Sequence, residues 1–92
     1  MIVTEKEAEA FLEAMHFPVI KRMYCQSAVE CERAARTIGY PVAMKIVSPS
    51  IVHKSDVGGV ALDLVNPGIV KKHFLRMKRI RGFKGVMIQE FA

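Results

Sequence analysis

The sequence lacks several features on which whole classes of protein depend. It has no apolar run of the roughly 18–20 residues that a membrane-spanning helix needs. Its start, MIVTEKEAEA, has no basic segment followed by an apolar one, so no signal peptide is expected. Its two cysteines, Cys25 and Cys31, are too few for a disulfide scaffold and are expected to be free thiols, with Cys31 buried. A cytoplasmic protein with no membrane partner is predicted.

Common nucleotide and metal signatures are missing as well. The chain contains neither G-x-x-x-x-G-K-[ST] nor G-x-G-x-x-G. Neither His16 nor His73 has a second histidine or a cysteine at metal-ligand spacing, so no metal site is predicted.

The residues that are present predict one small globular domain, because 92 residues are 51% hydrophobic and 25% charged. The net charge of +5 is unevenly spread. Four of the nine acids lie in the first thirteen residues, whereas seven of the fourteen lysines and arginines lie between Lys71 and Lys84, a span without an acid. The asymmetry indicates either a polyanionic partner or an ordinary solvated helix face.

The first half of the chain predicts two helices and two strands. Thr4 and Glu7 form a capping-box pattern that begins an amphipathic helix over residues 5–15. Residues 19–25 are predicted to form a strand, and the charges of Lys21 and Arg22 favour a position at the edge of the sheet. Ser27 and Glu30 begin a second helix that Gly39 ends, and residues 41–47 form the next strand.

The second half predicts a strand over 60–65, paired antiparallel to 41–47 through the intervening loop. A third helix begins at Asn66–Pro67, ends at Gly82, and exposes its basic residues. The last strand covers 85–91. The order α-β-α-β-β-α-β predicts an α+β fold: a small, mostly antiparallel sheet covered by helices on one face.

Polar and charged residues that could bind a ligand lie on the strand 41–47 and in the loop that follows it. Lys45 interrupts the apolar strand PVAMKIV, so its ammonium either reaches solvent or meets an anion. The loop that follows, SPSIVHKSDVGG, ends in two glycines whose backbone can approach a ligand closely. It also offers the imidazole of His53, the charge of Lys54, the hydroxyl of Ser55 and the carboxylate of Asp56. This set suits phosphate chemistry, although a solvated hairpin loop would use similar residues.

Read as one string, GYPVAMKIVSPSIVHKSDVGGVALDL closely resembles the ATP-grasp segment of the NDP-forming acyl-CoA synthetases, also called ADP-forming acetyl-CoA synthetases. The runs G-Y-P-V, M-K-I-V-S-P and H-K-S-D-V-G-G-V stand in the family's order and spacing. The flanking segments T-E-K-E-A-E-A-F-L and G-V-M-I-Q-E-F also look like the family's first helix and hinge strand. The resemblance covers essentially the whole chain and implies that residues 1–92 form the first lobe of an ATP-grasp domain.

The resemblance also implies roles for individual residues. Lys45 matches the lysine that contacts nucleotide phosphates, and Gly58 and Gly59 match the loop that covers them. His53 matches the histidine thought to carry phosphate between two sites, with Asp56 and Lys54 orienting or neutralising it. The remaining implied nucleotide contacts, some on the hinge strand beside the adenine, are Ser55, Gln89, Glu90 and Phe91.

The family's other parts are not in this sequence. The second lobe, which carries the Mg²⁺ ligands, and the CoA-binding domain would be supplied by further domains or subunits. The resemblance therefore implies a nucleotide-binding lobe of an ADP-forming acid–CoA ligase, using ATP or ADP, with Mg²⁺ bound only when the second lobe is present. Two alternatives stay open: an ATP-binding or regulatory module without turnover, and a small basic nucleic-acid binder. The nucleic-acid binder is disfavoured because Phe74 and Phe83 are the only aromatic residues in the basic run, residues 71–84, and bases stack on aromatic side chains.

Overall fold

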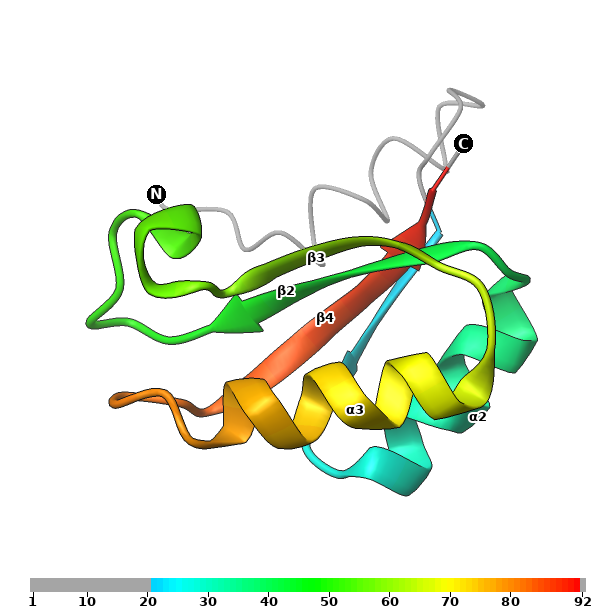
Figure 1. The fold of residues 1–92 in the computed structure, drawn as a ribbon, viewed down its shortest axis with the longest axis horizontal. Helices are drawn as coiled ribbons and strands as arrows, with labels where there is room; N and C mark the ends of the chain where they lie inside the picture. Colours follow the sequence, from blue (N-terminus) through cyan, green and yellow to red (C-terminus); the bar gives the residue numbers. More distant parts are fainter. Residues whose placement is uncertain (1–20, 92) are drawn as a thin grey trace, which may run out of the picture.

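The computed structural model describes residues 21–91 (Figure 1). The helix predicted over 5–15, and His16, lie outside the described residues. Within the described part the element order is β1, α2, β2, η1, β3, α3 and β4, so the predicted β-α-β-β-α-β order is confirmed. No helix of residues 21–91 is long and apolar enough to cross a membrane.

Four strands form one antiparallel sheet in the order β1-β4-β2-β3. Their bounds are Arg22–Cys25, Gly85–Glu90, Val42–Val47 and Val60–Leu64, in the same order. The predicted edge position of the first strand and the antiparallel pairing of β2 with β3 are both confirmed. In the central pair, Met44 lies opposite Ile88 and Lys45 lies opposite Met87.

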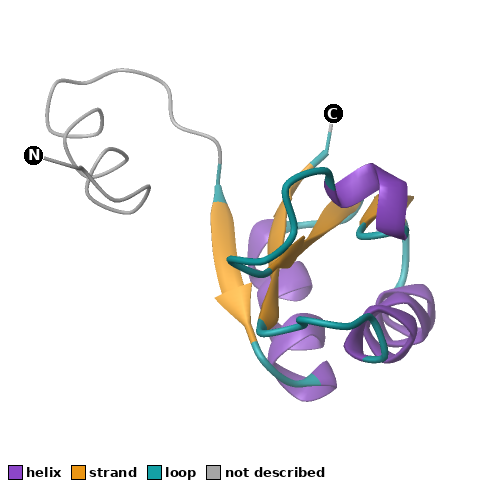
Figure 2. Ribbon diagram, turned by 90° about the vertical axis from the view of Figure 1, so that its left-hand side faces the viewer, coloured by secondary structure: helices purple, strands orange, loops and turns teal. Residues whose placement is uncertain are grey.

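Both α-helices cover the same face of this sheet (Figure 1; Figure 2). Helix α2 spans Ala28–Ile38 and begins where the Ser27 hydroxyl accepts a hydrogen bond from the Glu30 amide. Helix α3 spans Pro67–Lys78 and begins where the Asn66 side chain accepts one from the Ile69 amide. Both caps satisfy amide groups that the first helical turn leaves without a partner.

The core lies between the helices and the sheet, and strand alternation decides its membership. Met44 and Ile46 of β2 and Val86 and Ile88 of β4 point toward the helices and are fully buried. The helices contribute buried residues at helical spacing, and both cysteines are buried and free, as predicted for Cys31. The helical members of the core are Cys31, Ala34, Ala35, Val70, Phe74 and Met77.

Helix α3 ends at Lys78, so the prediction that it continues to Gly82 is wrong. The amides of Arg79 and Ile80 donate to the carbonyls of Arg76 and Met77, and this tighter turn ends the helix. The turn brings Phe83 edge-on to Phe74, with ring centroids 5.7 Å apart. The contact between Phe74 and Phe83 therefore outweighs the preference for a helix to end at a glycine, here Gly82.

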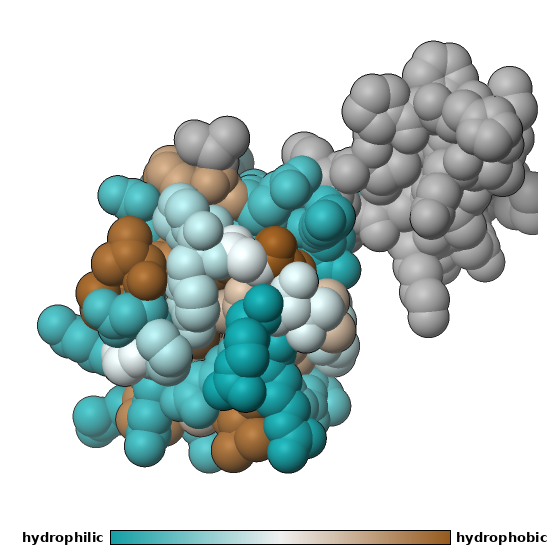
Figure 3. Space-filling view, turned by 90° about the vertical axis from the view of Figure 1, so that its right-hand side faces the viewer, coloured by the Kyte–Doolittle hydropathy of each residue, from teal (hydrophilic) through white to brown (hydrophobic). Residues whose placement is uncertain are grey.

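The surface outside the core mixes residue types. Figure 3 views one end of the molecule and shows hydrophilic residues around smaller hydrophobic areas. Large apolar side chains that are exposed include Leu62 of edge strand β3 and Val65, which follows it. Scattered apolar residues of this kind are ordinary on soluble domains.

Gly59 is predicted to tolerate no side chain. It is buried, and a Cβ built there would collide with the Cγ2 atom of Ile46 and lie 3.1 Å from the Lys54 carbonyl oxygen. Gly59→Ala should lower the free energy of unfolding by about 2 kcal/mol, as overpacking does. Urea unfolding followed by circular dichroism measures the change.

Gly68→Ala is the matched control. Gly68 lies in the first turn of α3, where an added Cβ meets only the Asn66 side chain at 3.4 Å. Because alanine favours helix over glycine, this variant should be unchanged or more stable by about 0.5 kcal/mol. Equal stability of the two variants would contradict the packing described for Gly59.

Candidate functional site

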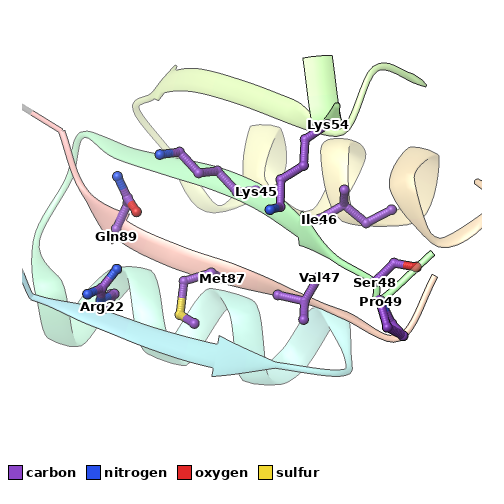
Figure 4. A pocket seen from close by; sticks show the side chains of 9 residues that line it. All are labelled: Arg22, Lys45, Ile46, Val47, Ser48, Pro49, Lys54, Met87 and Gln89. Atoms are coloured by element: carbon purple, nitrogen blue, oxygen red, sulfur yellow. The ribbon is translucent and has the colours of Figure 1, made fainter. Parts of the chain in front are cut away.

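The sheet face opposite the helices carries a cavity of about 530 Å³ (Figure 4). Its floor comes from alternate residues of adjacent strands, namely Lys45 and Val47 of β2 and Met87 and Gln89 of β4. Arg22 of β1, which lies opposite Gln89, extends the floor toward the edge of the sheet. We call this the sheet-face cavity.

The loop after β2 forms the wall of the sheet-face cavity. Ser48, Pro49 and Lys54 line it, and in Figure 4 the Lys54 side chain extends from the loop toward β2. A short 3₁₀ helix, η1 (Lys54–Val57), carries Lys54 and is followed by Gly58 in the left-handed conformation, with a φ of 75°. Residues 54–59, which we call the glycine turn, thus hold one lysine above the sheet.

Hydrogen bonds join the glycine turn to the sheet. The Gly59 amide donates to the Lys54 carbonyl over 2.7 Å, which closes the turn on itself. The Ile46 amide donates to the Gly59 carbonyl, also over 2.7 Å, which ties the turn to β2. Ile46 thereby fixes the loop with its backbone while its side chain remains in the core.

Positive charge is the main electrostatic feature of the sheet-face cavity. Arg22, Lys45 and Lys54 line it, and among residues 21–91 no acidic residue lines it. A surface lined by several like charges attracts ligands of the opposite sign, in this case anions. Since Val47, Met87 and Pro49 also line the cavity, it suits a ligand with an anionic part and a less polar part.

The structure brings together only some of the predicted site residues. Lys45, Lys54 and Gln89 line the sheet-face cavity, and Gly58 and Gly59 shape the turn beside it. His53, Ser55 and Asp56 are exposed on the loop and do not line the cavity. His53 stands one residue before η1, so it adjoins Lys54 in the chain.

The predicted hinge residues lie at the end of β4. The Glu90 amide donates to the Lys21 carbonyl over 3.0 Å, and the Phe91 amide donates to the Pro41 carbonyl over 3.3 Å. Neither side chain lines the sheet-face cavity, although Gln89 immediately before them does. The backbone of this segment is therefore engaged in the sheet, and only Gln89 faces the cavity.

The sequence reasoning missed four lining residues of note: Arg22, Val47, Met87 and Pro49. The local sequence indicates Arg22 only as a charge on an edge strand. Its alignment opposite Gln89 was the available signal, but that alignment depends on the pairing of β1 with β4, more than sixty residues apart. Strand alternation could have identified Val47 and Met87 once the sheet order was known.

Comparison with known proteins relates this chain to ATP-grasp domains and to ADP-forming CoA ligases. The ATP-grasp domain family matches residues 1–92. Acetate–CoA ligase [ADP-forming] II of Archaeoglobus fulgidus is 39% identical over 89 residues, which are 97% of this chain and 13% of that protein. The beta subunit of acetate–CoA ligase [ADP-forming] I of Pyrococcus furiosus is 37% identical over 83 residues, covering 89% of this chain and 36% of the subunit.

Solved structures of ACD1 and of acetyl-coenzyme A synthetase 1 from Ca. Korarchaeum cryptofilum are also similar. The structure of ACD1 in complex with coenzyme A has a TM-score of 0.79 and 40% identity, and this match covers 95% of this chain and 40% of that chain. Another contains coenzyme A and Mg-AMPPCP, with a phosphohistidine segment that points toward the nucleotide-binding site. It has a TM-score of 0.74 and 38% identity, and covers 97% of this chain and 38% of that one.

Lys45→Met should leave the free protein unchanged or more stable by about 0.5 kcal/mol, because it removes one of three clustered cations and adds apolar surface. Tripolyphosphate should raise the melting temperature of the wild type and raise that of Lys45→Met much less. Thermal unfolding at low ionic strength, with and without tripolyphosphate, measures both effects.

Lys71→Met, on the exposed side of α3, is the control for net charge. It should respond to tripolyphosphate as the wild type does. If both variants lost the response equally, the anion would be bound by overall charge and not by the sheet-face cavity.

Proposed function

Because the chain belongs to the ATP-grasp domain family, we propose that its sheet-face cavity binds the phosphates of ATP or ADP within an ADP-forming acid–CoA ligase. One observation carries the proposal: three cationic side chains from separate segments line one cavity, to which the described residues contribute no acid. The phosphates of a nucleotide carry the negative charge that such a lining attracts. Lysine is a common phosphate ligand because its ammonium is a compact charge with three donors.

Each cation has a different geometric role in this proposal. Lys45 rises from the floor of the cavity on β2, whose central place in the sheet makes it the most fixed of the three. Lys54 approaches from the glycine turn and extends over β2 from the wall of the cavity. Arg22 stands on the far side of Gln89 and offers a planar fork of donors.

The adenine end is assigned to the end of β4. Gln89 faces the cavity and can both donate and accept hydrogen bonds. Glu90 and Phe91 follow it with their amide groups already bonded, so they can contribute only carbonyl oxygens and side chains to a nucleotide. The proposal thus places phosphate recognition at the loop and base recognition at the opposite end of the cavity.

We assign phosphate transfer to His53. A ring nitrogen of neutral His53 attacks the γ-phosphorus of ATP, the bond from that phosphorus to the β–γ bridging oxygen breaks, and ADP leaves. An N–P bond forms at the attacking nitrogen, and the proton on the other ring nitrogen passes to water, so that a phosphohistidine with a neutral ring and ADP remain. Since His53 is exposed and does not line the cavity, the loop must move for the ring to reach the γ-phosphate, with Asp56 orienting the ring.

Magnesium does not fit the residues described here. Residues 21–91 contain no group of three or more histidine, cysteine or acidic side chains that could hold a metal ion. The sheet-face cavity is also lined by cations, which repel a divalent metal. We therefore assign the ligands of Mg²⁺ to the nucleotide and to another lobe, and the CoA site to a further domain or subunit.

Isothermal titration of the chain with Mg-ATP tests nucleotide binding. Lys45→Met and Lys54→Met should each weaken ATP binding about tenfold, because each removes a charged hydrogen-bond donor from the phosphates. Lys71→Met should bind within twofold of the wild type. Equal affinity in all four proteins would contradict the proposal.

Phosphorylation of His53 is tested in the assembled ligase with ATP labelled at the γ-phosphate. The wild type should acquire an acid-labile label on this chain, and His53→Asn should acquire none while its ATP affinity stays within twofold. If His53→Asn acquired the label as the wild type does, another residue would be the phosphate carrier. If the wild type bound ATP but took no label, the chain would be a binding module without turnover.

A further inference from the structure

An arginine on α3 reaches across to the glycine turn. Arg76 donates a hydrogen bond from Nη1 to the Gly58 carbonyl oxygen over 2.6 Å. The two residues are 18 positions apart, so this bond links the helix layer to the loop beside the sheet-face cavity. No prediction from the sequence assigned a role to Arg76 beyond its membership of the basic run.

A histidine one turn earlier on α3 holds the same guanidinium. The Nδ1 atom of His73 lies 3.4 Å from Nε and 3.2 Å from Nη2 of Arg76. Because a guanidinium can only donate, His73 Nδ1 must accept and its ring proton must be on Nε2. The guanidinium is therefore held between a ring nitrogen on one side and a backbone carbonyl on the other.

The environment keeps His73 in the accepting form. Burial lowers the pKa of His73, and the charges of Arg76 and Lys72 lower it further. These two cations are the charged groups that act on the ring among residues 21–91, and both stand on α3. A protonated ring would lose its acceptor at Nδ1 and would repel the guanidinium, so acid should release Arg76 from His73.

Gly58 is the residue on which the glycine turn depends. Its backbone is left-handed, and its amide donates to the Ser55 carbonyl over 3.1 Å. The Gly59 amide, which shares its peptide unit with the Gly58 carbonyl, donates to the Lys54 carbonyl. The bond from Arg76 completes the set, because it fixes the carbonyl oxygen of that peptide, and a Cβ on Gly58 would lie 3.1 Å from Nη1.

We propose that Arg76, supported by neutral His73, is a positioning residue that holds the glycine turn and so keeps Lys54 over the sheet-face cavity. The inference rests on the proposed function, since Lys54 is one of the three cations assigned to the phosphates. Arg76 acts through the carbonyl of Gly58 and does not itself line the cavity. Nucleotide affinity should accordingly depend on a residue outside the binding surface and on the protonation of His73.

The first test follows the turn in the free protein. Amide hydrogen exchange, measured by NMR, should be about tenfold faster at Gly58 and Gly59 in Arg76→Met than in the wild type. Arg79→Met removes the same charge just beyond the end of α3, from a side chain without a hydrogen bond in the described residues, and should leave both rates unchanged. Unchanged exchange in Arg76→Met would overturn the proposal.

The second test follows Mg-ATP affinity. Arg76→Met should weaken binding about fivefold, Arg76→Lys should weaken it by less because a charge remains, and Arg79→Met should bind as the wild type does. Equal weakening by Arg76→Met and Arg79→Met would show that only overall charge matters, and would overturn the proposal. If the wild type itself bound no ATP, the proposed function would fail, whereas the exchange rates in the free protein would still decide whether Arg76 holds the turn.

The third test uses pH. Wild-type affinity relative to His73→Asn should be unchanged at pH 7.5 and should fall only below the ordinary histidine pKa of about 6.5, because the pKa of His73 is lowered and an asparagine oxygen can accept from Arg76 but does not titrate. His73→Ala, which has no acceptor, should be weak throughout this range of pH. A wild type that follows His73→Asn at every pH would show that His73 has no part in positioning Arg76.

Discussion

The pairing of β2 with β4 is the constraint on which the rest of this molecule depends. It places Met44 and Ile46 toward the helices and Lys45 and Val47 toward the cavity. A shift of one residue would reverse both sets, exposing a methionine and burying an ammonium. The free energy of burying the core therefore selects the register that presents Lys45 on the open face. In this way packing on one face determines the chemistry of the other.

The same strand also positions the loop. The amide of Ile46 bonds to Gly59, and a Cβ at Gly59 would meet the side chain of Ile46. Arg76 then holds the turn from the side of α3. The loop thus has two attachments, one to the sheet at Gly59 and one to a helix at Gly58, while His53 and Asp56, which precede both, remain exposed. Such an arrangement fixes Lys54 and leaves the histidine segment accessible.

Local sequence signals predicted the elements well, because capping residues and strand alternation act over a few positions. Ser27 and Asn66 begin helices as expected. The end of α3 was misplaced because the contact of Phe74 with Phe83 is tertiary and outweighs the turn preference of Gly82. The candidate site was predicted in part: Lys45 could be identified by its odd place in an apolar strand. Arg22 and Arg76 could not, since their roles depend on strand pairing and on a helix-to-loop contact between distant positions.

The central claim is that three clustered cations on the open sheet face receive nucleotide phosphates. A crystal structure of the chain with a non-hydrolysable ATP analogue tests it most directly. We expect phosphate oxygens about 2.7–3.1 Å from the Nζ atoms of Lys45 and Lys54, with the base toward Gln89. Phosphates bound instead along the basic face of α3, with no analogue in the sheet-face cavity, would contradict it.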